Sequence, residues 1–313
     1  MSFTIPFRSS LSPRIRPPQF AGISYPDTEA ECRAMCRSAI EQYIHHHEEQ
    51  HRIAHDLCAL LVPHIDFRVN LDCYSAVYHH LRTIPKPDII LLLATSHHGW
   101  QDVIIPTYQH FQTPLGVMKT DQESVEKLYA YCGFSLTQDD SAHAPEHSIE
   151  FEVLWLQYML GNDIPIIPLL CTGFDSFDAE LPTASGRRGH CVKALQQVLV
   201  ELQAEGKRVL TVVSGDLSHV GKRFGDTQTA HAMANVVWRY EEDLLTALAN
   251  CSESAYYDIL RRNDDAYRIC GAVPTLIMLQ ILSPQRATQV YHAKWDDVDT
   301  DSSVGFATML FFS

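Results

Sequence analysis

The sequence predicts an α/β fold, with a single domain in which a mostly parallel central sheet is flanked by helices. Several short segments are continuously apolar rather than alternating, which is typical of strands buried on both faces of a parallel sheet. Segments with helical spacing of apolar residues separate them. The chain of 313 residues contains no internal repeat and no Gly-, Ser- or Pro-rich linker. Because α/β folds commonly reach this length as one domain, we expect one domain here.

The N-terminal region predicts an extended arm followed by a capped helix. Residues 1–20 are rich in Pro and Arg and have no hydrophobic periodicity, so we expect the arm there and the single domain over 21–313. Thr28 and Glu31 have the spacing of a helix-start capping box. Apolar residues then recur at helical spacing, which predicts a helix from Thr28 to about His51.

The rest of the chain alternates between apolar runs and helical patterns. The apolar runs predict four buried strands, at residues 58–62, 88–94, 164–170 and 209–213. Helical spacing predicts helices at residues 71–81, 122–131, 149–160, 190–204, 229–248 and 274–282. Two more strands are predicted near the C-terminus, at residues 288–293 and 304–312.

Composition argues against several classes of protein. The net charge is −14 and no basic stripe is present, which argues against a nucleic-acid surface. The longest apolar runs are too short to span a bilayer, and the N-terminal segment lacks the apolar core of a signal peptide. The nine cysteines are odd in number and include no CxxC pair. We therefore expect a cytoplasmic protein with mostly buried thiols and no nucleic-acid or membrane partner.

Histidine is abundant, with 17 residues. Imidazole is the commonest metal ligand and titrates near neutrality. Ligand sites in open α/β sheets lie beyond the carboxyl ends of the strands. Polar residues follow three of the predicted buried strands, namely His64, then His97 and His98, then Asp216 and His219. The sequence therefore predicts that these side chains meet at one rim of the sheet.

Two helix starts are candidates for completing this site. Glu146, His147 and Ser148 precede the predicted helix at 149–160, where free backbone N–H groups favour an anion or a polarised oxygen. The alternative is that Glu146 or Ser148 simply caps the helix. Cys270 precedes another predicted helix, whose N-terminus would lower the thiol pKa. Of the nine cysteines it is the one we predict to be functional, and the others suit buried positions.

The densest group of histidines is predicted to lie outside the site. Five histidines occur between residues 45 and 55, and His47, His51 and His55 share one helix face by i,i+4 spacing. Such a face could bind a metal adventitiously. The flanking Glu and Gln residues instead indicate a solvated helix end.

Several segments occur together in a characteristic order, namely PHIDF, TSHHG, YQHFQTPLG, EHSIEFEVLWL, VVSGDLSHVGKRFG, ICG and DSSVGFA. In sequence and order these motifs resemble the Memo family, also called AmmeMemoRadiSam system protein B. The resemblance covers the chain from about residue 21 to the end. It implies a fold similar to that of the class III extradiol dioxygenases, which are non-haem iron enzymes. It also implies iron or copper as the cofactor and a redox role.

The resemblance also implies a site. Its metal ligands fall on His64, His97 and Cys270, with Asp216 and His219 nearby. The usual PHAGY-like segment is PHIDF here, which puts an added carboxylate beside His64 and leaves the substrate open. Combined with the strand-end argument, the expected catalytic residues are His219, Asp216 and His147, and the expected substrate-binding residues are His98, Glu146 and Ser148.

Three functions follow as hypotheses. The first is a metal-dependent, dioxygenase-like oxidoreductase, with iron if Asp216 is the third ligand and copper or zinc if Cys270 is. The second is a zinc-dependent hydrolase with Asp216 or Glu146 as base. The third is a non-catalytic protein that uses the same pocket to bind a small molecule, a peptide, a phosphate or a partner, including other proteins of the AmmeMemoRadiSam system. The residues alone favour none of these metals.

Overall fold

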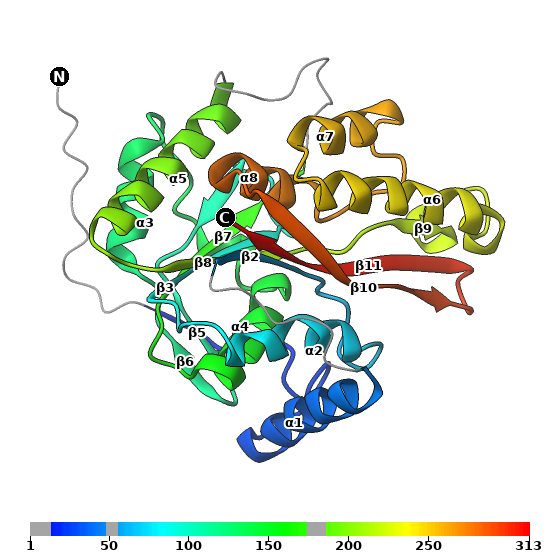
Figure 1. Cartoon of the computed structure of the whole chain (residues 1–313), viewed down its shortest axis with the longest axis horizontal. Helices are drawn as coiled ribbons and strands as arrows, with labels where there is room; N and C mark the ends of the chain where they lie inside the picture. Colours follow the sequence, from blue (N-terminus) through cyan, green and yellow to red (C-terminus); the bar gives the residue numbers. More distant parts are fainter. Residues whose placement is uncertain (1–13, 48–55, 174–185) are drawn as a thin grey trace.

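The computed structural model describes residues 14–47, 56–173 and 186–313 (Figure 1). Within these residues the main sheet has eight strands, in the order β10-β11-β2-β8-β3-β7-β4, with β9 paired to β11. Their bounds are β2 Leu57–Val62, β3 Ile89–Thr95, β4 Ile104–Pro106, β7 Ile166–Cys171, β8 Val209–Ser214, β9 His219–Gly221, β10 Arg286–Asp297 and β11 Ser302–Phe312. All six predicted strands are therefore present, with ends shifted by one or a few residues.

The sheet has the predicted parallel centre but is mixed rather than purely parallel. Strands β2, β8, β3 and β7 are parallel to one another and form its centre. At the edges, β4 is antiparallel to β7, and β11 is antiparallel to both β2 and β10. A turn of residues 298–301 joins β10 to β11 and makes this pair antiparallel. The β4–β7 and β11–β2 pairs join segments far apart in the sequence, so no local turn sets their direction. The α/β fold class itself is confirmed.

Helices cover both faces of this sheet, as Figure 1 shows. Helices α3, α5, α6, α7 and α8 pack on one face, and α1, α2 and α4 pack on the other. Successive residues of the central strands point to opposite faces, so that Leu91 and Leu93 enter one core and Leu92 enters the other. This two-sided burial explains why the strands read as continuous apolar runs. The helix bounds are α1 Glu29–His46, α2 Asp72–Tyr78, α3 Gln122–Tyr131, α4 Ser148–Leu160, α5 Gly186–Ala204, α6 Ala230–Ala249, α7 Glu253–Arg262 and α8 Ala272–Leu282.

Helix α1 begins as predicted but ends earlier. The Thr28 hydroxyl accepts a hydrogen bond from the backbone N–H of Glu31, as the capping motif requires. The helix ends at His46 rather than near His51, because His47 adopts extended backbone angles. His47 is exposed, in keeping with a solvated helix end. Its predicted helix-face neighbours lie outside the described residues, so that prediction is not tested there.

Some elements escaped prediction. Helix α7 has Ser252 as its capping residue and buries Tyr256 and Leu260 on one face. The helix predicted at 71–81 is present but shorter, because α2 ends at Tyr78 and a 3₁₀ turn follows it. Two 3₁₀ turns, at Asp140–Ala142 and Lys222–Phe224, were also missed. The missed strands have two to four residues and are too short to show a period. They are β4, β9 and the three strands of a small sheet, β1 Ile15–Arg16, β5 His110–Thr113 and β6 Gly116–Met118.

The described part of the predicted N-terminal arm is docked against the body. Strand β1 pairs in parallel with β5. Arg16 is buried and its guanidinium donates to the backbone oxygens of His143 and Glu146, at 2.6 Å each, and to the Glu150 carboxylate at 2.5 Å. The arm therefore supports the segment that leads into α4. Across the described ranges, no helix is long and apolar enough to cross a bilayer.

Candidate metal centre

The carboxyl ends of three neighbouring parallel strands carry the predicted site. Strands β2, β8 and β3 are adjacent and point the same way. His64 lies two residues beyond β2, His97 two residues beyond β3, and Asp216 two residues beyond β8. The structure therefore brings these side chains to one rim, as the sequence predicted.

Three imidazole rings converge at this rim. The ring of His64 lies 5.0 Å from those of both His97 and His147 and is nearly perpendicular to each. The rings of His97 and His147 stack at 4.8 Å. One nitrogen of each ring lies within 4.8 Å of the others, close enough for one ion to bind all three. His147, expected as a catalytic residue, thus also belongs to a candidate ligand group.

A single buried carboxylate orients two of these rings. Glu146 accepts a hydrogen bond from Nδ1 of His97 at 2.9 Å, and Nδ1 of His147 lies 3.2 Å from the same oxygen. Burial alone would raise the pKa of Glu146, but hydrogen bonds and positive charge from His147 and His97 outweigh burial and hold it well below its usual range. With both Nδ1 atoms engaged by an anion, the Nε2 atoms are the ones left to bind a metal.

Glu146 also binds the start of helix α4. Its carboxylate accepts from the backbone N–H groups of His147 and Ser148, at 2.9 and 3.1 Å, and of His97 at 2.7 Å. The expected capping role and the role at the histidines are therefore combined in one side chain. Ser148 is fully buried and its hydroxyl donates to the backbone oxygen of Thr95.

A second candidate ligand group shares His64 with the first. Its members are His64, Asp216 and Cys270. Nε2 of His64 lies 3.3 Å from Sγ of Cys270 and 3.7 Å from the Asp216 carboxylate. The other Asp216 oxygen accepts from the backbone N–H of His64, and the backbone N–H of Asp216 donates to Cys270 Sγ at 3.1 Å. These bonds tie the ends of β2, β8 and α8 together.

Burial controls protonation in this second group. It lowers the pKa of His64 well below its usual value, with the neighbouring His97 as a further cause. It raises the pKa of Asp216 to about 7. It also raises the pKa of the Cys270 thiol well above its usual range, with the Asp216 charge as a further cause, so the lowered thiol pKa expected at this helix start is wrong. His64 is therefore neutral near neutrality, the form in which imidazole binds metals.

His219 lies beside the rim with its ring anchored. Nδ1 of His219 lies 3.1 Å from the backbone oxygens of both Leu217 and Arg268, so this nitrogen carries the hydrogen and Nε2 is an acceptor. Burial lowers the pKa of His219 to about 4, despite these hydrogen bonds. A neutral imidazole with a free acceptor can take up a proton.

Two other predicted features lie apart from the ligand groups. His98 is exposed, with its ring 6.5 Å from that of His97. The added carboxylate of Asp66 binds Arg68, which donates from its backbone N–H and guanidinium, and it accepts a bond from Ser24. Asp66 therefore stabilises the turn that contains it. It belongs to neither ligand group.

Sequence reasoning missed several supporting residues. The Thr95 hydroxyl donates to the backbone oxygen of Cys270 at 2.7 Å and so links β3 to the cysteine. Ser214 faces His64, and Arg16 holds the segment before α4. Ser214 directly precedes the recognised Gly-Asp pair, which is the one signal that could have identified it. No pattern in the sequence indicated Arg16.

Two glycines allow the Asp216 and Cys270 loops to meet. A Cβ atom on Gly215 would lie 2.3 Å from the Cα of Gly271. Across this contact, the backbone N–H of Gly271 donates a hydrogen bond to the backbone oxygen of Asp216 at 3.0 Å. Any side chain at 215 would push the two loops apart.

We predict that Gly215→Ala destabilises the fold by roughly 1–3 kcal/mol, the usual cost of overpacking. The urea midpoint should fall. The matched control is Gly173→Ala, since a Cβ there meets no atom of the described residues within 4 Å. It should change stability by less than about 0.5 kcal/mol. Equal stability of both variants would contradict the close-contact interpretation.

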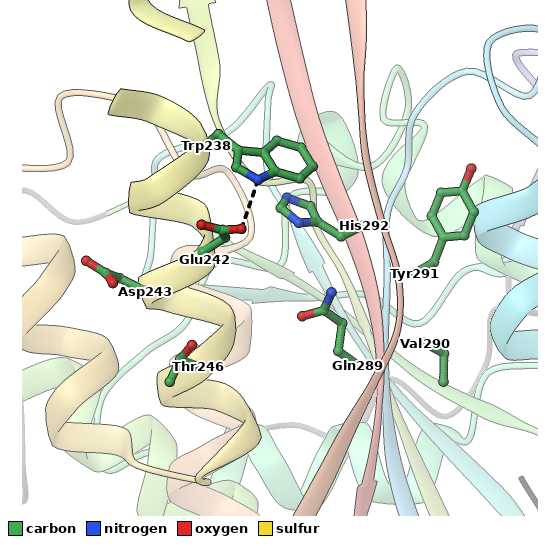
Figure 2. A pocket seen from close by; sticks show the side chains of 8 residues that line it. All are labelled: Trp238, Glu242, Asp243, Thr246, Gln289, Val290, Tyr291 and His292. Atoms are coloured by element: carbon green, nitrogen blue, oxygen red, sulfur yellow. Dashed lines mark hydrogen bonds between the residues drawn. The ribbon is translucent and has the colours of Figure 1, made fainter. Parts of the chain in front are cut away.

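A separate pocket lies between helix α6 and strand β10 (Figure 2). Its volume is about 700 Å³. Trp238 from α6 donates to Glu242, and its ring stacks on that of His292 from β10 at 4.0 Å. None of the predicted site residues lines it. The convergence of ligand atoms, rather than pocket size, therefore locates the candidate centre.

The chain is similar to known proteins of one family over most of its length. The family model described as Memo-like protein matches residues 16–310. A MEMO1 family protein from Aquifex aeolicus is 26% identical over 304 residues, which cover 95% of this chain and 73% of that protein. One from Thermus thermophilus is 28% identical over 297 residues, 95% of this chain and 82% of that protein. One from Methanosarcina acetivorans is 28% identical over 239 residues, 74% of this chain and 78% of that protein.

The matched segment includes every candidate ligand at the rim, from His64 to Cys270. It also includes the buried Arg16 at its first position. Since the match extends over nearly the whole chain, the chain belongs to the Memo-like protein family.

Proposed function

We propose that this protein is a metal-dependent oxidoreductase of the non-haem iron or copper type, with its metal at the rim formed by β2, β8 and β3. The observation that carries the proposal is the convergence of His64, His97 and His147. Each ring has its Nδ1 next to a protein oxygen, from Glu146 or Ser214, so each can present Nε2 to one point. A metal-binding histidine regularly has such a hydrogen-bond partner, here called an outer partner, on the ring nitrogen that does not bind the metal.

The donor atoms suit a transition metal. Three imidazoles form one candidate group, and an imidazole, a carboxylate and a thiol form the other. Two histidines with one carboxylate favour Fe(II), whereas a thiolate favours Cu(I) or zinc. The ligand set that the resemblance implies, His64, His97 and Cys270, draws on both groups, because His97 and Cys270 do not share a group among the described residues. We propose His64 as the ligand common to either group, with Asp216 beside it. A bound iron or copper ion would supply one-electron chemistry.

The chain's own groups have separate proposed roles. His219 offers Nε2 as an acceptor, so we assign it a catalytic role toward a substrate hydrogen. Its pKa, lowered to about 4, makes it a weaker base near neutrality than an ordinary histidine. Glu146 and Ser148 are buried and hold the rings and the strand ends in place. The exposed His98 remains a proposed contact for substrate.

The proposal is tested by loading the metal-free protein anaerobically with Fe(II), Cu(I) or Zn(II). We expect one ion per chain, and anomalous scattering should place it against His64 and His97. Oxygen uptake with a catechol would support the oxidoreductase. Tight binding of zinc alone with hydrolytic activity would favour the hydrolase instead. If no ion binds at the rim, both metal-dependent hypotheses fail. The result would favour the non-catalytic binding protein, with a small molecule, a peptide or proteins of the AmmeMemoRadiSam system as the proposed partners.

Two substitutions distinguish the ligand groups. With Cys270 as ligand, Cys270→Ser should weaken Cu(I) binding roughly tenfold or more, since a hydroxyl is a poor ligand for a soft ion. His147→Ala should then have the smaller effect. The readout is competition with a Cu(I) chelator. Cys251→Ser, which alters a half-buried thiol outside both groups, is the control. The reverse order of effects would assign the ion to the three histidines.

A further inference from the structure

The side of His64 that faces away from the candidate ligands contacts a buried serine. Ser214 is the last residue of β8 and lies beside Val62 in the neighbouring strand β2. Its Oγ is 3.1 Å from Nδ1 of His64. Both side chains are buried, Ser214 completely. The opposite ring nitrogen, Nε2, faces Cys270 and Asp216.

The hydroxyl hydrogen of Ser214 takes part in a hydrogen bond to a group other than His64. Its hydroxyl donates to the backbone oxygen of Ser148 at 2.8 Å. A hydroxyl has one hydrogen and two lone pairs, so toward His64 it can only accept. Nδ1 of His64 must therefore carry the ring hydrogen. Nε2 then has its lone pair directed at the candidate ligands.

A buried carboxyl lies behind this serine. Glu152, on α4, is fully buried and accepts a hydrogen bond from Tyr78 at 2.5 Å. Ser214 acts on its carboxyl group and lowers its pKa, against the larger effect of burial. Burial raises the pKa of Glu152 well above its usual value. A protonated Glu152 would donate to Ser214, and an ionised one would compete with Ser148 for the serine proton. In both cases the single hydroxyl hydrogen of Ser214 is donated to Ser148 or Glu152, so Ser214 cannot donate to His64.

We propose that Ser214 is a positioning residue which, with Glu152 behind it, holds His64 in the Nδ1–H tautomer and so aims Nε2 at the metal. The consequence for metal binding rests on the proposed function. The tautomer itself is a property of the metal-free chain. The chain from His64 through Ser214 to Glu152 and Tyr78 thereby links the candidate centre to the core beneath α4.

The test uses NMR of the full-length, metal-free protein labelled with ¹⁵N-histidine. Ring nitrogen shifts should show His64 as the Nδ1–H tautomer in the wild type. In Ser214→Ala the acceptor is lost, so a mixture of tautomers is expected. Affinity for Zn(II), measured by chelator competition, should fall roughly 10- to 100-fold, as is usual when an outer partner of a metal-binding histidine is removed.

The control is Ser75→Ala, which removes another fully buried hydroxyl, one without a hydrogen-bond partner among the residues that the structure describes. It should leave tautomer and affinity unchanged. In Glu152→Leu a partial tautomer shift is expected, and an unchanged spectrum would remove Glu152 from the proposal. A wild-type His64 with hydrogen on Nε2 would overturn the proposal outright, even if Ser214→Ala did not fold. The expected tautomer without any metal binding would instead refute the proposed function and leave this inference standing.

Discussion

Replacing His64 by alanine is expected to lower metal affinity by more than roughly 100-fold, beyond the loss usually seen for an outer partner. His64 is the one residue shared by both candidate ligand groups, so either group loses a ligand. It is also neutral near neutrality and has its free nitrogen at the rim. The measurement is anaerobic competition against a chelator of known affinity, for each of iron, copper and zinc.

The control for this substitution is His231→Ala, which removes an exposed imidazole on α6. It should bind metal as the wild type does. Far-UV circular dichroism establishes that the His64 variant is folded, and His97→Ala provides a second test at the same rim. Wild-type affinity in folded His64→Ala would show that the ion, if bound, lies elsewhere.

Replacing Arg16 by alanine is expected to destabilise the fold by about 3–5 kcal/mol, the cost of breaking a buried ion pair. Arg16 and Glu150 are 2% and 1% exposed, and their charged atoms are 2.5 Å apart. Without the guanidinium, the Glu150 carboxylate stays buried with only the neutral donors Tyr25, Gln19 and Phe20. The urea unfolding midpoint should fall accordingly.

An exposed ion pair offers the matched comparison. Arg33 and Glu29 form an i,i+4 pair on α1 with both side chains exposed. Arg33→Ala should therefore cost less than about 1 kcal/mol. Arg16 also donates to the backbone oxygens of His143 and Glu146, so its loss should loosen the segment that carries His147. An effect of Arg16→Ala as small as that of Arg33→Ala would show that the arm does not brace this segment.

The larger elements of the fold were predictable because their sequences carry a local signal. Strands β2, β3, β7 and β8 are buried on both faces and are apolar throughout. Helix α3 matches its prediction at both ends, since Asp121 caps it and apolar residues recur on one face. The short strands carry no such signal. Their pairing depends on neighbours distant in sequence, as β1 with β5 shows.

The site was predictable in part for the same kind of reason. His64, His97 and Asp216 follow recognisable strands, and the rule that parallel strands place their carboxyl ends at one edge brings them together. That rule gives no distance or orientation. It could not show that His98 is exposed and belongs to neither ligand group, while its neighbour His97 joins one of them.

The sequence alone determined the α/β class, the family resemblance and the rim at which the histidines gather, because each depends on local patterns and chain order. Only the tertiary structure decided the mixed sheet, the membership of His147 beside His64 and His97, and the anchoring of these rings by Glu146 and Ser214. The physical reason is that hydrogen bonds between side chains depend on three-dimensional positions to within a fraction of an ångström. The order of residues along the chain does not specify such positions.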